Sequence, residues 1–443
     1  MTLSRNILLA SLFCIINSLS AQHEMALHFM PTTLQTGIIN PALRPTDHKW
    51  GISLFGYNTQ INSNLPIRQY ISRTSVDISG LLNTLAETDN TLAVNGSAQT
   101  IAFGFGIKKL WFGLRNDLVV NSSSSFPAGL PRLILEGNAP YIGQTMQFGP
   151  TINMGVYSAT ALQVAFEATS KLSVGITAKH LLGLGAFNTT KSDLSLYTDP
   201  EIYQLTLNTN YAFDLAGIEP SELNVNIDSI TGIPSLNTGT SSRTNSNGVG
   251  FDIGAAYKIS PKLTLRASII GLGTVTWKTG KNYATSGQFR YEGAKITQLV
   301  GQDTLDFGVN LDSLFDGFDV TNTDKRVTYN TPASAYLSAM YRINGQFTVG
   351  ALFQVERLNK DQAIGGAVHA QWHPTRWIQT GVTIGARQYT APASVGFHII
   401  VKPGPFQLYY ATDNILSKLV PSTTQISGHR VGLNLMFGKR NKE

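Results

Sequence analysis

The chain has 443 residues, of which 14% are charged, and a formal net charge of +6. Ordinary soluble domains carry roughly 25% charged residues, so the composition points away from a simple soluble domain. The positive charge is scattered rather than gathered in a lysine or arginine stripe, which argues against a nucleic-acid partner. Cys14 is the only cysteine, which excludes a disulfide framework within the chain and a cysteine zinc site.

Residues 1–21 predict a secretory signal peptide. Arg5 supplies the positive start, residues 7–16 supply an apolar stretch, and Ser18-Leu19-Ser20-Ala21 supplies small residues before a cleavage site. Cleavage before Gln22 would also remove Cys14, so the mature chain would contain no thiol. The alternative is a short N-terminal helix buried in a folded domain.

Residues 22–49 do not alternate, yet they are rich in apolar side chains. Pro31, Pro41 and Pro45 exclude a continuous helix or a central strand. Because such a segment has to bury its side chains, we expect it to form a plug in the periplasmic mouth of a barrel made by the residues that follow. The alternative is a periplasmic docking peptide for a partner protein, with Asn40-Pro41-Ala42 as its turn.

From residue 50 onwards, apolar and polar residues alternate. In the segment 346–356, one face carries only apolar side chains, those of Phe347, Val349, Ala351, Phe353 and Val355. A period of two residues indicates a strand. The pattern predicts about fourteen strands, at 50–60, 91–107, 109–121, 150–169, 172–184, 248–259, 263–277, 333–343, 346–358, 362–373, 376–389, 394–402, 405–412 and 429–437.

The connections between these strands are alternately short and long. The short ones are predicted at Lys108-Lys109, Ser170-Lys171, Ser260-Pro261-Lys262, Asn344-Gly345, Pro374-Thr375 and Pro403-Gly404. The long ones are predicted as polar loops at roughly 61–90, 122–149, 185–247 and 278–332. This asymmetry is typical of outer-membrane barrels, which have short periplasmic turns and long external loops.

No uncharged apolar run after residue 22 approaches the roughly 20 residues of a helical membrane span. A membrane protein without such runs must close a sheet to satisfy its backbone. We therefore predict an all-β transmembrane antiparallel β-barrel over residues 50–437, with a C-terminal tail at 438–443, in the cell outer membrane. All tryptophans lie at predicted strand ends, which favours aromatic girdles at the membrane interfaces, namely Trp50, Trp111, Trp277, Trp372 and Trp377.

Several polar residues are predicted to face the lumen of this barrel, namely Arg115, Asp117, Glu167, Lys179, Asp252, Arg266, Arg342, Glu356, His369, Arg387 and His398. Cross-barrel ion pairs and hydrogen bonds are one interpretation, because buried charges need partners. A selective aqueous path is the other. The histidines accompany no metal or hydrolase motif, so we predict neither catalytic residues, nor an enzyme, nor a metal or cofactor.

Asp303, Asp312 and Asp324 belong to an aspartate-rich stretch in the fourth long loop. Closely spaced carboxylates could hold calcium, but their spacing matches no EF-hand, and a solvated acidic loop is the alternative. Three Asp-Ser/Thr-aliphatic triplets resemble the O-glycosylation sequence used by Bacteroidota. They make Ser229, Thr304 and Ser313 candidate O-glycosylation sites.

Four short motifs carry a family resemblance. They are Leu27-His28-Phe29-Met30, Asn40-Pro41-Ala42-Leu43, Leu135-Glu136-Gly137-Asn138 and the stretch from Tyr211 to Asp214, together with the hairpin at Ser170-Lys171. They resemble outer-membrane barrels of Bacteroidota without an assigned function, which look like distant relatives of the fourteen-stranded long-chain fatty-acid transporter superfamily. That superfamily also includes a barrel component of the type IX secretion system. The resemblance implies a barrel with its N-terminal segment in the lumen, and no catalytic residues.

Two functions remain open from the sequence. One is a channel or transporter for a small molecule, including a hydrophobic one, which the superfamily resemblance favours. The other is a structural or docking component of a secretion or surface-attachment assembly, which the two longest loops favour. The expected partners are therefore outer-membrane lipid and either a small-molecule cargo or secretion-system proteins, with no nucleic acid.

Overall fold

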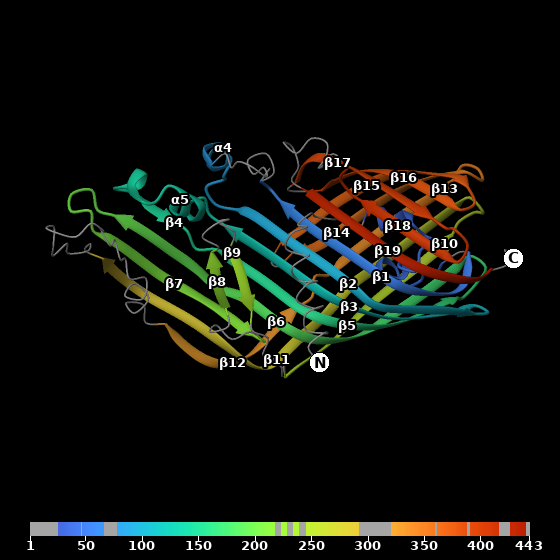
Figure 1. Cartoon of the computed structure of the whole chain (residues 1–443), viewed down its shortest axis with the longest axis horizontal. Helices are drawn as coiled ribbons and strands as arrows, with labels where there is room; N and C mark the ends of the chain where they lie inside the picture. Colours follow the sequence, from blue (N-terminus) through green and yellow to red (C-terminus); the bar gives the residue numbers. More distant parts are fainter. Residues whose placement is uncertain are drawn as a thin grey trace.

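Fourteen strands form a closed antiparallel barrel, in which the last strand pairs back onto the first (Figure 1). The structure, a computed structural model, describes residues 25–45, 47–65, 78–217, 223–227, 234–238, 245–291, 320–358, 361–387, 390–415 and 426–439. The barrel strands are β1 (His48–Ser63), β2 (Asn90–Ile107), β3 (Leu110–Phe126), β5 (Thr151–Glu167), β6 (Leu172–Thr198), β10 (Ser246–Lys258), β11 (Leu263–Tyr291), β13 (Ser334–Arg342), β14 (Phe347–Leu358), β15 (Asp361–Thr375), β16 (Ile378–Arg387), β17 (Thr390–Val401), β18 (Phe406–Thr412) and β19 (Ile426–Lys439). Each of the fourteen predicted strands is present, so the predicted all-β antiparallel barrel is confirmed.

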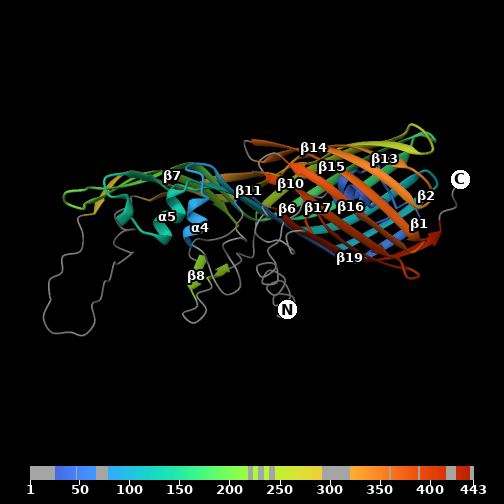
Figure 2. The ribbon, with the colours of Figure 1, turned by 90° about the horizontal axis from the view of Figure 1, so that it is seen from above.

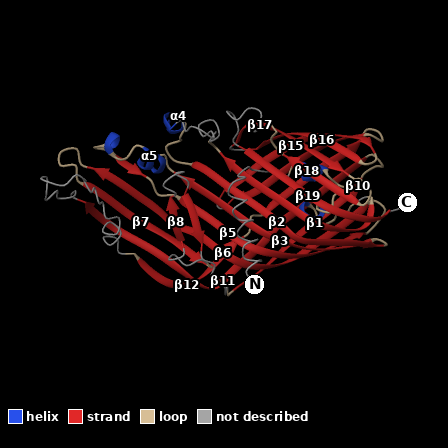
Figure 3. Cartoon of the chain, in the orientation of Figure 1, coloured by secondary structure: helices blue, strands red, loops and turns tan. Residues whose placement is uncertain are grey.

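Six of the short connections lie at one end of the barrel, which we call the short-turn end (Figure 3). They span residues 108–109, 168–171, 259–262, 343–346, 376–377 and 402–405. The connection predicted at Pro374-Thr375 was misplaced, because β15 continues through Thr375 and the turn follows at 376–377.

The outer face of the barrel is apolar and the inner face is mixed. On β14, Phe353 is 49% exposed on the outside, whereas its neighbours Leu352 and Gln354 are buried inside. Comparable outward positions occur around the wall, including Ile101 on β2, Ile176 on β6 and Val382 on β16. An alternating strand with one apolar outer face is what a barrel wall in contact with lipid requires.

β6 and β11 are 27 and 29 residues long, and their last parts extend beyond the barrel. Their outer parts pair with opposite edges of β7 (Leu205–Ala216), and β12 (Thr321–Asn330) pairs with the other edge of β11. These four strands form a sheet that projects from the end opposite the short turns, and we call it the extension sheet (Figures 1 and 3).

The prediction that 185–247 and 278–332 are polar loops was therefore wrong for their described parts. β7 continues the line of β10 between β6 and β11, because β10 pairs with the first part of β6 and β7 with the last. The alternation of Leu205 to Leu215 is that of a strand. Its pairing partners are strand extensions rather than a neighbouring hairpin, so turn spacing could not indicate it.

Smaller elements lie around the extended end of the molecule. They are β4 (Thr145–Gln147), α4 (Ile78–Asn83), α5 (Gly129–Leu135), η2 (Ala139–Tyr141) and the hairpin of β8 (Leu223–Ile227) and β9 (Pro234–Thr238). Figure 2 shows α4, α5 and β8 on the same side of the extension sheet. Near α4 and the start of α5, a small apolar cluster is formed by Leu65, Leu82, Leu85 and Ala128.

The tryptophans divide into two groups, which corrects the prediction that all five form interface girdles. Trp50, Trp372 and Trp377 are 39–47% exposed on the outer surface. Trp111 and Trp277 are only 2% and 1% exposed and lie inside. Trp277 belongs to an internal aromatic cluster with Tyr157 and Tyr329, supported by Val275 and Val327. Gly183 permits this packing, since a Cβ there would lie 2.2 Å from the indole ring.

The N-terminal segment lies inside the barrel. Residues 25–45, hereafter the plug, contain the 3-10 helix η1 (Ala26–Phe29) and the one-turn helix α2 (Thr36–Ile39). The plug begins beside Asp413, just past the far end of β18, and reaches the short-turn end, where Arg44 forms an ion pair with Glu167. The predicted location of an N-terminal segment within the lumen is thus part of the fold. The segment boundaries and the signal peptide remain predictions, since residues 1–24 lie outside the described part.

Candidate functional site: a plugged lumen with an internal cavity

Apolar side chains anchor the plug at two places on the inner wall. Ala26, Leu27, Met30 and Ile39 pack against a wall patch of Ile400, Tyr409 and Ala411. Met25 and Phe29 pack against a second patch formed by Tyr336, Met340, Leu352 and Ala367. Complete burial of a side chain such as Leu27 or Phe29 contributes roughly 1.5–3 kcal/mol. The apolar side chains of this proline-containing segment are therefore buried against the inner wall of the barrel.

Polar wall residues satisfy the carbonyl groups of the plug backbone. The Gln163 amide donates to the carbonyls of Pro41 and Leu43, at 2.7 and 2.9 Å. Equivalent bonds run from Arg266 to His28 (2.9 Å), from Ser268 to Ile39 (2.6 Å), from Gln371 to Phe29 (3.1 Å) and from Gln407 to Thr32 (2.9 Å). Because the plug has little regular structure, its buried carbonyls need these external donors.

Two side chains fix the ends of the plug. The Asn40 amide donates to the carbonyls of Ala255 and Ala267, paired residues of β10 and β11, at 3.1 and 3.0 Å. Its oxygen accepts the N–H of Ala42. At the other end, the Asp413 carboxylate accepts the N–H groups of Met25 and Ala26, at 3.3 and 3.1 Å. The Asn40-Pro41 turn therefore holds the plug against β10 and β11 inside the lumen.

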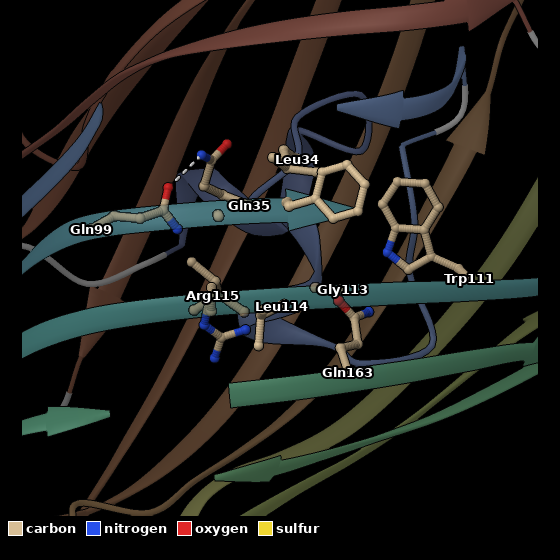
Figure 4. A pocket seen from close by; sticks show the side chains of 12 residues that line it. Leu34, Gln35, Gln99, Trp111, Gly113, Leu114, Arg115 and Gln163 are labelled. Carbon is tan, nitrogen blue, oxygen red and sulfur yellow. Dashed lines mark hydrogen bonds between the residues drawn. The ribbon is translucent and has the colours of Figure 1, made fainter. Parts of the chain in front are cut away.

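Gln35 joins the plug to three wall strands. Its amide nitrogen lies within hydrogen-bond distance of oxygen atoms of Ser53 on β1, Gln99 on β2 and Asn434 on β19, and Asn434 donates back to the Gln35 oxygen at 3.0 Å. Figure 4 shows the bond between Gln35 and Gln99. The remaining space beside it, near Trp111 and Gln163, is about 20 Å³. That volume holds about one water molecule, so the plug fits closely against this part of the wall.

A larger cavity of about 220 Å³ adjoins the plug at Ile38. Its lining includes Asn58, Gln60, Asn95 and Asn121 on β1 to β3, and Tyr157 and Leu181 on β5 and β6. Tyr157 also belongs to the internal aromatic cluster. The cavity is therefore bordered by the plug on one side and by aromatic side chains on another.

Four of the residues predicted to face the lumen form two ion pairs. Arg115 contacts Asp117 at 2.9 Å, and Lys179 contacts the fully buried Asp252 at 2.6 Å. Arg115, Asp117 and Lys179 line the cavity, as does Glu356. The pairing favours the interpretation of a charge-compensated lumen near the cavity, since unpaired buried charge is costly.

The other predicted charged residues are dispersed. Arg266 lies against the plug, and Glu167 pairs with Arg44 at the short-turn end. Arg342 is exposed at the end of β13. Arg387 ends β16, and its side chain lies outside the described set. These four residues do not belong to one site.

The two inward histidines come together beneath the plug. His369 and His398 stack with centroids 5.2 Å apart, and the Nδ1 atom of His369 lies 2.9 Å from the Thr383 hydroxyl. No group of three or more histidine, cysteine or acidic residues that could hold a metal occurs among the described residues. Ser229, Thr304 and Ser313 all lie outside the described residues, so their modification remains a prediction.

The sequence analysis missed the amides that bind the plug. Gln163, Gln371, Gln407 and Asn434 are uncharged and were not singled out, although each has inward parity on its strand. Their inward parity was available from the alternation. Their role was not, because it depends on which carbonyls the plug presents to them.

None of the helices in the described part of the chain is long and apolar enough to span a membrane.

Comparison with solved structures finds other barrels at low identity. The Pseudomonas putida toluene transporter TodX has 12% identity and a TM-score of 0.44, with 92% of this chain and 95% of that chain covered. The Ralstonia pickettii toluene transporter TbuX has 11% identity and a TM-score of 0.42, covering 90% and 92%. A Pseudomonas aeruginosa FadL homologue has 10% identity and a TM-score of 0.39, covering 92% and 94%. Similarity at this level gives no information about the molecule that a barrel transports.

No curated protein matches the chain. A family model does match, over residues 41–413, which includes the last five residues of the plug and every barrel strand except β19. The chain therefore belongs to the family of unknown function DUF5723.

Proposed function

We propose that this protein is an outer-membrane transporter for a small molecule, in which the plug closes the lumen until it moves. The observation that carries this proposal is the fit of residues 25–45 inside a closed barrel, next to an internal cavity of about 220 Å³. A barrel with a purely structural role needs neither an obstructing segment held by hydrogen bonds nor a cavity beside it.

Location in the outer membrane is supported by the outer face of the wall and by the predicted signal peptide. Outward side chains such as Ile101, Phe353 and Val368 are about half exposed. In water such an extensive apolar surface would promote aggregation, whereas in lipid it is satisfied. The short-turn end would then face the periplasm, as in other outer-membrane barrels.

The way in which the plug is held supports a movable gate. Its backbone is bound mainly by hydrogen bonds from neutral side chains such as Gln163, Gln371 and Gln407. Each contributes only about 1 kcal/mol net, since water offers replacement bonds when the plug leaves. These hydrogen bonds therefore hold the plug in one position, but water can replace them when the plug moves.

Single-channel conductance in planar bilayers tests the gate. Deletion of residues 22–45, with the signal peptide kept, should raise the conductance well above that of the intact barrel. In the full chain, Gln35→Cys and Asn434→Cys can be joined by a short bifunctional reagent that forms a disulfide with each thiol, since the two native amides are hydrogen-bonded. Cross-linking should suppress openings, and reduction should restore them.

Each single-cysteine variant treated with the same reagent is the control for the cross-link. Heat-modifiable migration on gels reports that each barrel is folded. A folded deletion variant with unchanged conductance would rule out the plug as a gate.

The extension sheet supports a second candidate, a docking component of a surface assembly. β6, β7, β11 and β12 project a sheet beyond the barrel, which a simple pore does not need. Co-purification of the intact barrel with stable partner proteins, combined with conductance that does not respond to plug deletion, would favour this candidate over transport.

A further inference from the structure

The cavity beside the plug has one wall built of side-chain amides. Gln60, Asn95 and Asn121 lie in register on the neighbouring strands β1, β2 and β3. Asn95 donates to the Gln60 oxygen at 3.5 Å, and Asn121 donates to the Tyr157 hydroxyl at 3.0 Å. Each carboxamide offers both donors and an acceptor, so bonds among themselves leave part of their capacity directed at the cavity.

Asn58 adds an unsatisfied group to this wall. It lines the cavity, is only 6% exposed, and its Oδ1 atom has no hydrogen-bond partner among the described residues. Leaving a buried acceptor unpaired costs roughly 1–3 kcal/mol, and a ligand that donates to it would remove that cost.

The charges at the cavity are balanced. Three cations (Arg115, Lys179 and Arg430) line it, together with two carboxylates (Asp117 and Glu356). A third carboxylate, that of Asp252, pairs with Lys179 from behind, which makes three charges of each sign. A site without net charge favours neither an anion nor a cation.

The cavity also has aliphatic lining. Ala159 and Leu181 on β5 and β6, and Ile270 on β11, contribute it. An occupant therefore meets aliphatic groups as well as hydrogen-bonding groups. The volume of about 220 Å³ suits a small solute.

We propose that this cavity is a binding site for a neutral, hydroxyl-rich solute the size of a monosaccharide, an inference that rests on the proposed transport function. A hydroxyl group donates one hydrogen bond and accepts others, which matches the donor and acceptor capacity of carboxamides. The C–H face of a sugar ring fits the aliphatic side chains of Leu181 and Ile270. A hydrocarbon fits them equally well but leaves the Asn58 Oδ1 atom without a donor and the remaining capacity of Gln60 and Asn121 unused, so the amide wall selects against it.

Ligand-observed NMR and equilibrium dialysis on the purified, plug-containing full chain test the proposal. The probes are D-glucose, its acidic derivative gluconate, the amine glucosamine, and toluene. We expect glucose to bind, the two charged analogues to bind more weakly, and excess toluene not to displace glucose. Stronger binding of toluene than of glucose would overturn the proposal without any variant.

Two isosteric variants locate the binding site. Asn58→Leu and Asn121→Leu should each weaken glucose binding about tenfold, as the loss of one or two hydrogen bonds implies. Asn116→Leu is the matched control, because Asn116 lies on β3 with the opposite parity and bonds to Ser158 and Thr160. It should leave binding unchanged. Equal weakening in all three variants, or in none, would contradict the assignment.

The plug-deletion measurement separates the two proposals. If deletion raises conductance but glucose does not bind, only the sugar site is wrong. If deletion leaves the conductance of a folded barrel unchanged, the transport function fails, and the sugar site fails with it as a transport site.

Discussion

Phe29 of the plug stacks face to face on His369 of β15, with ring centroids 4.2 Å apart and ring planes inclined by 5°. His369 stacks in turn on His398, and the two imidazoles meet above Gly381, where a Cβ would lie 2.6 Å from each ring. Phe29 is completely buried. One apolar anchor of the plug is therefore an aromatic stack on a histidine pair deep inside the lumen.

Phe29→Ala should release the plug while leaving the barrel folded. Removal of a buried phenylalanine ring costs about 3–5 kcal/mol, because no other side chain can fill the space. Limited proteolysis of the folded protein should then cut within residues 25–45 much faster than in the original chain. Phe353→Ala is the matched control, since Phe353 faces outwards on β14. Equal protease resistance of the Phe29 variant and the original chain would contradict the anchoring role.

Acid should weaken docking of the plug. Burial, with a further contribution from Arg266 and an opposing one from Glu356, lowers the pKa of His28 from 6.5 to about 3. A released plug binds a proton below pH 6.5 that the docked plug does not bind until about pH 3. Stability of the docked state is therefore lost as pH falls below 6.5, by about 1.4 kcal/mol per pH unit, or about 2 kcal/mol at pH 5.

Protease sensitivity of the plug at pH 5 and pH 7 measures this effect. His28→Gln should abolish the part of the pH dependence that comes from this group. An unchanged dependence in that variant would assign the effect to another residue.

Phe353→Arg should destabilise the barrel by roughly 2–4 kcal/mol, because it puts a charge on the lipid face near the middle of β14. Phe353→Leu keeps the apolar character and should cost far less. The free energy of unfolding, measured by denaturant titration in lipid vesicles, checks both. Equal stability of the two variants would mean that this face does not contact lipid.

Mature protein should begin near Gln22 and fractionate with the outer membrane, with heat-modifiable migration on gels. This outcome follows from the predicted signal peptide and from the apolar outer wall of the closed barrel. Terminal sequencing and membrane fractionation measure it. Recovery of the folded protein in the soluble periplasm would contradict the location.

The alternation from residue 50 onwards determined the barrel by itself. A strand has a period of two residues, so positions such as Phe353 and Gln354 reveal their faces without any tertiary information. Short breaks such as Asn344-Gly345 located most of the hairpins, because turn geometry is local. The apolar content and prolines of residues 22–49 likewise indicated a segment that must be buried outside regular structure.

Only the tertiary structure decided which distant residues meet. Trp277 lies at a predicted strand end, as the exposed tryptophans do, but in the folded chain it packs over Gly183 in the interior. β7 is a strand because β6 and β11 extend beyond the barrel and each provides an edge with which it pairs. The Gln163 amide binds a carbonyl group of the plug, and the Asn58 amide lines a cavity that residues of several strands share. Both roles depend on groups that are far away in the sequence. Hydrogen bonds of this kind depend on relative positions in space, which periodicity along one strand does not contain.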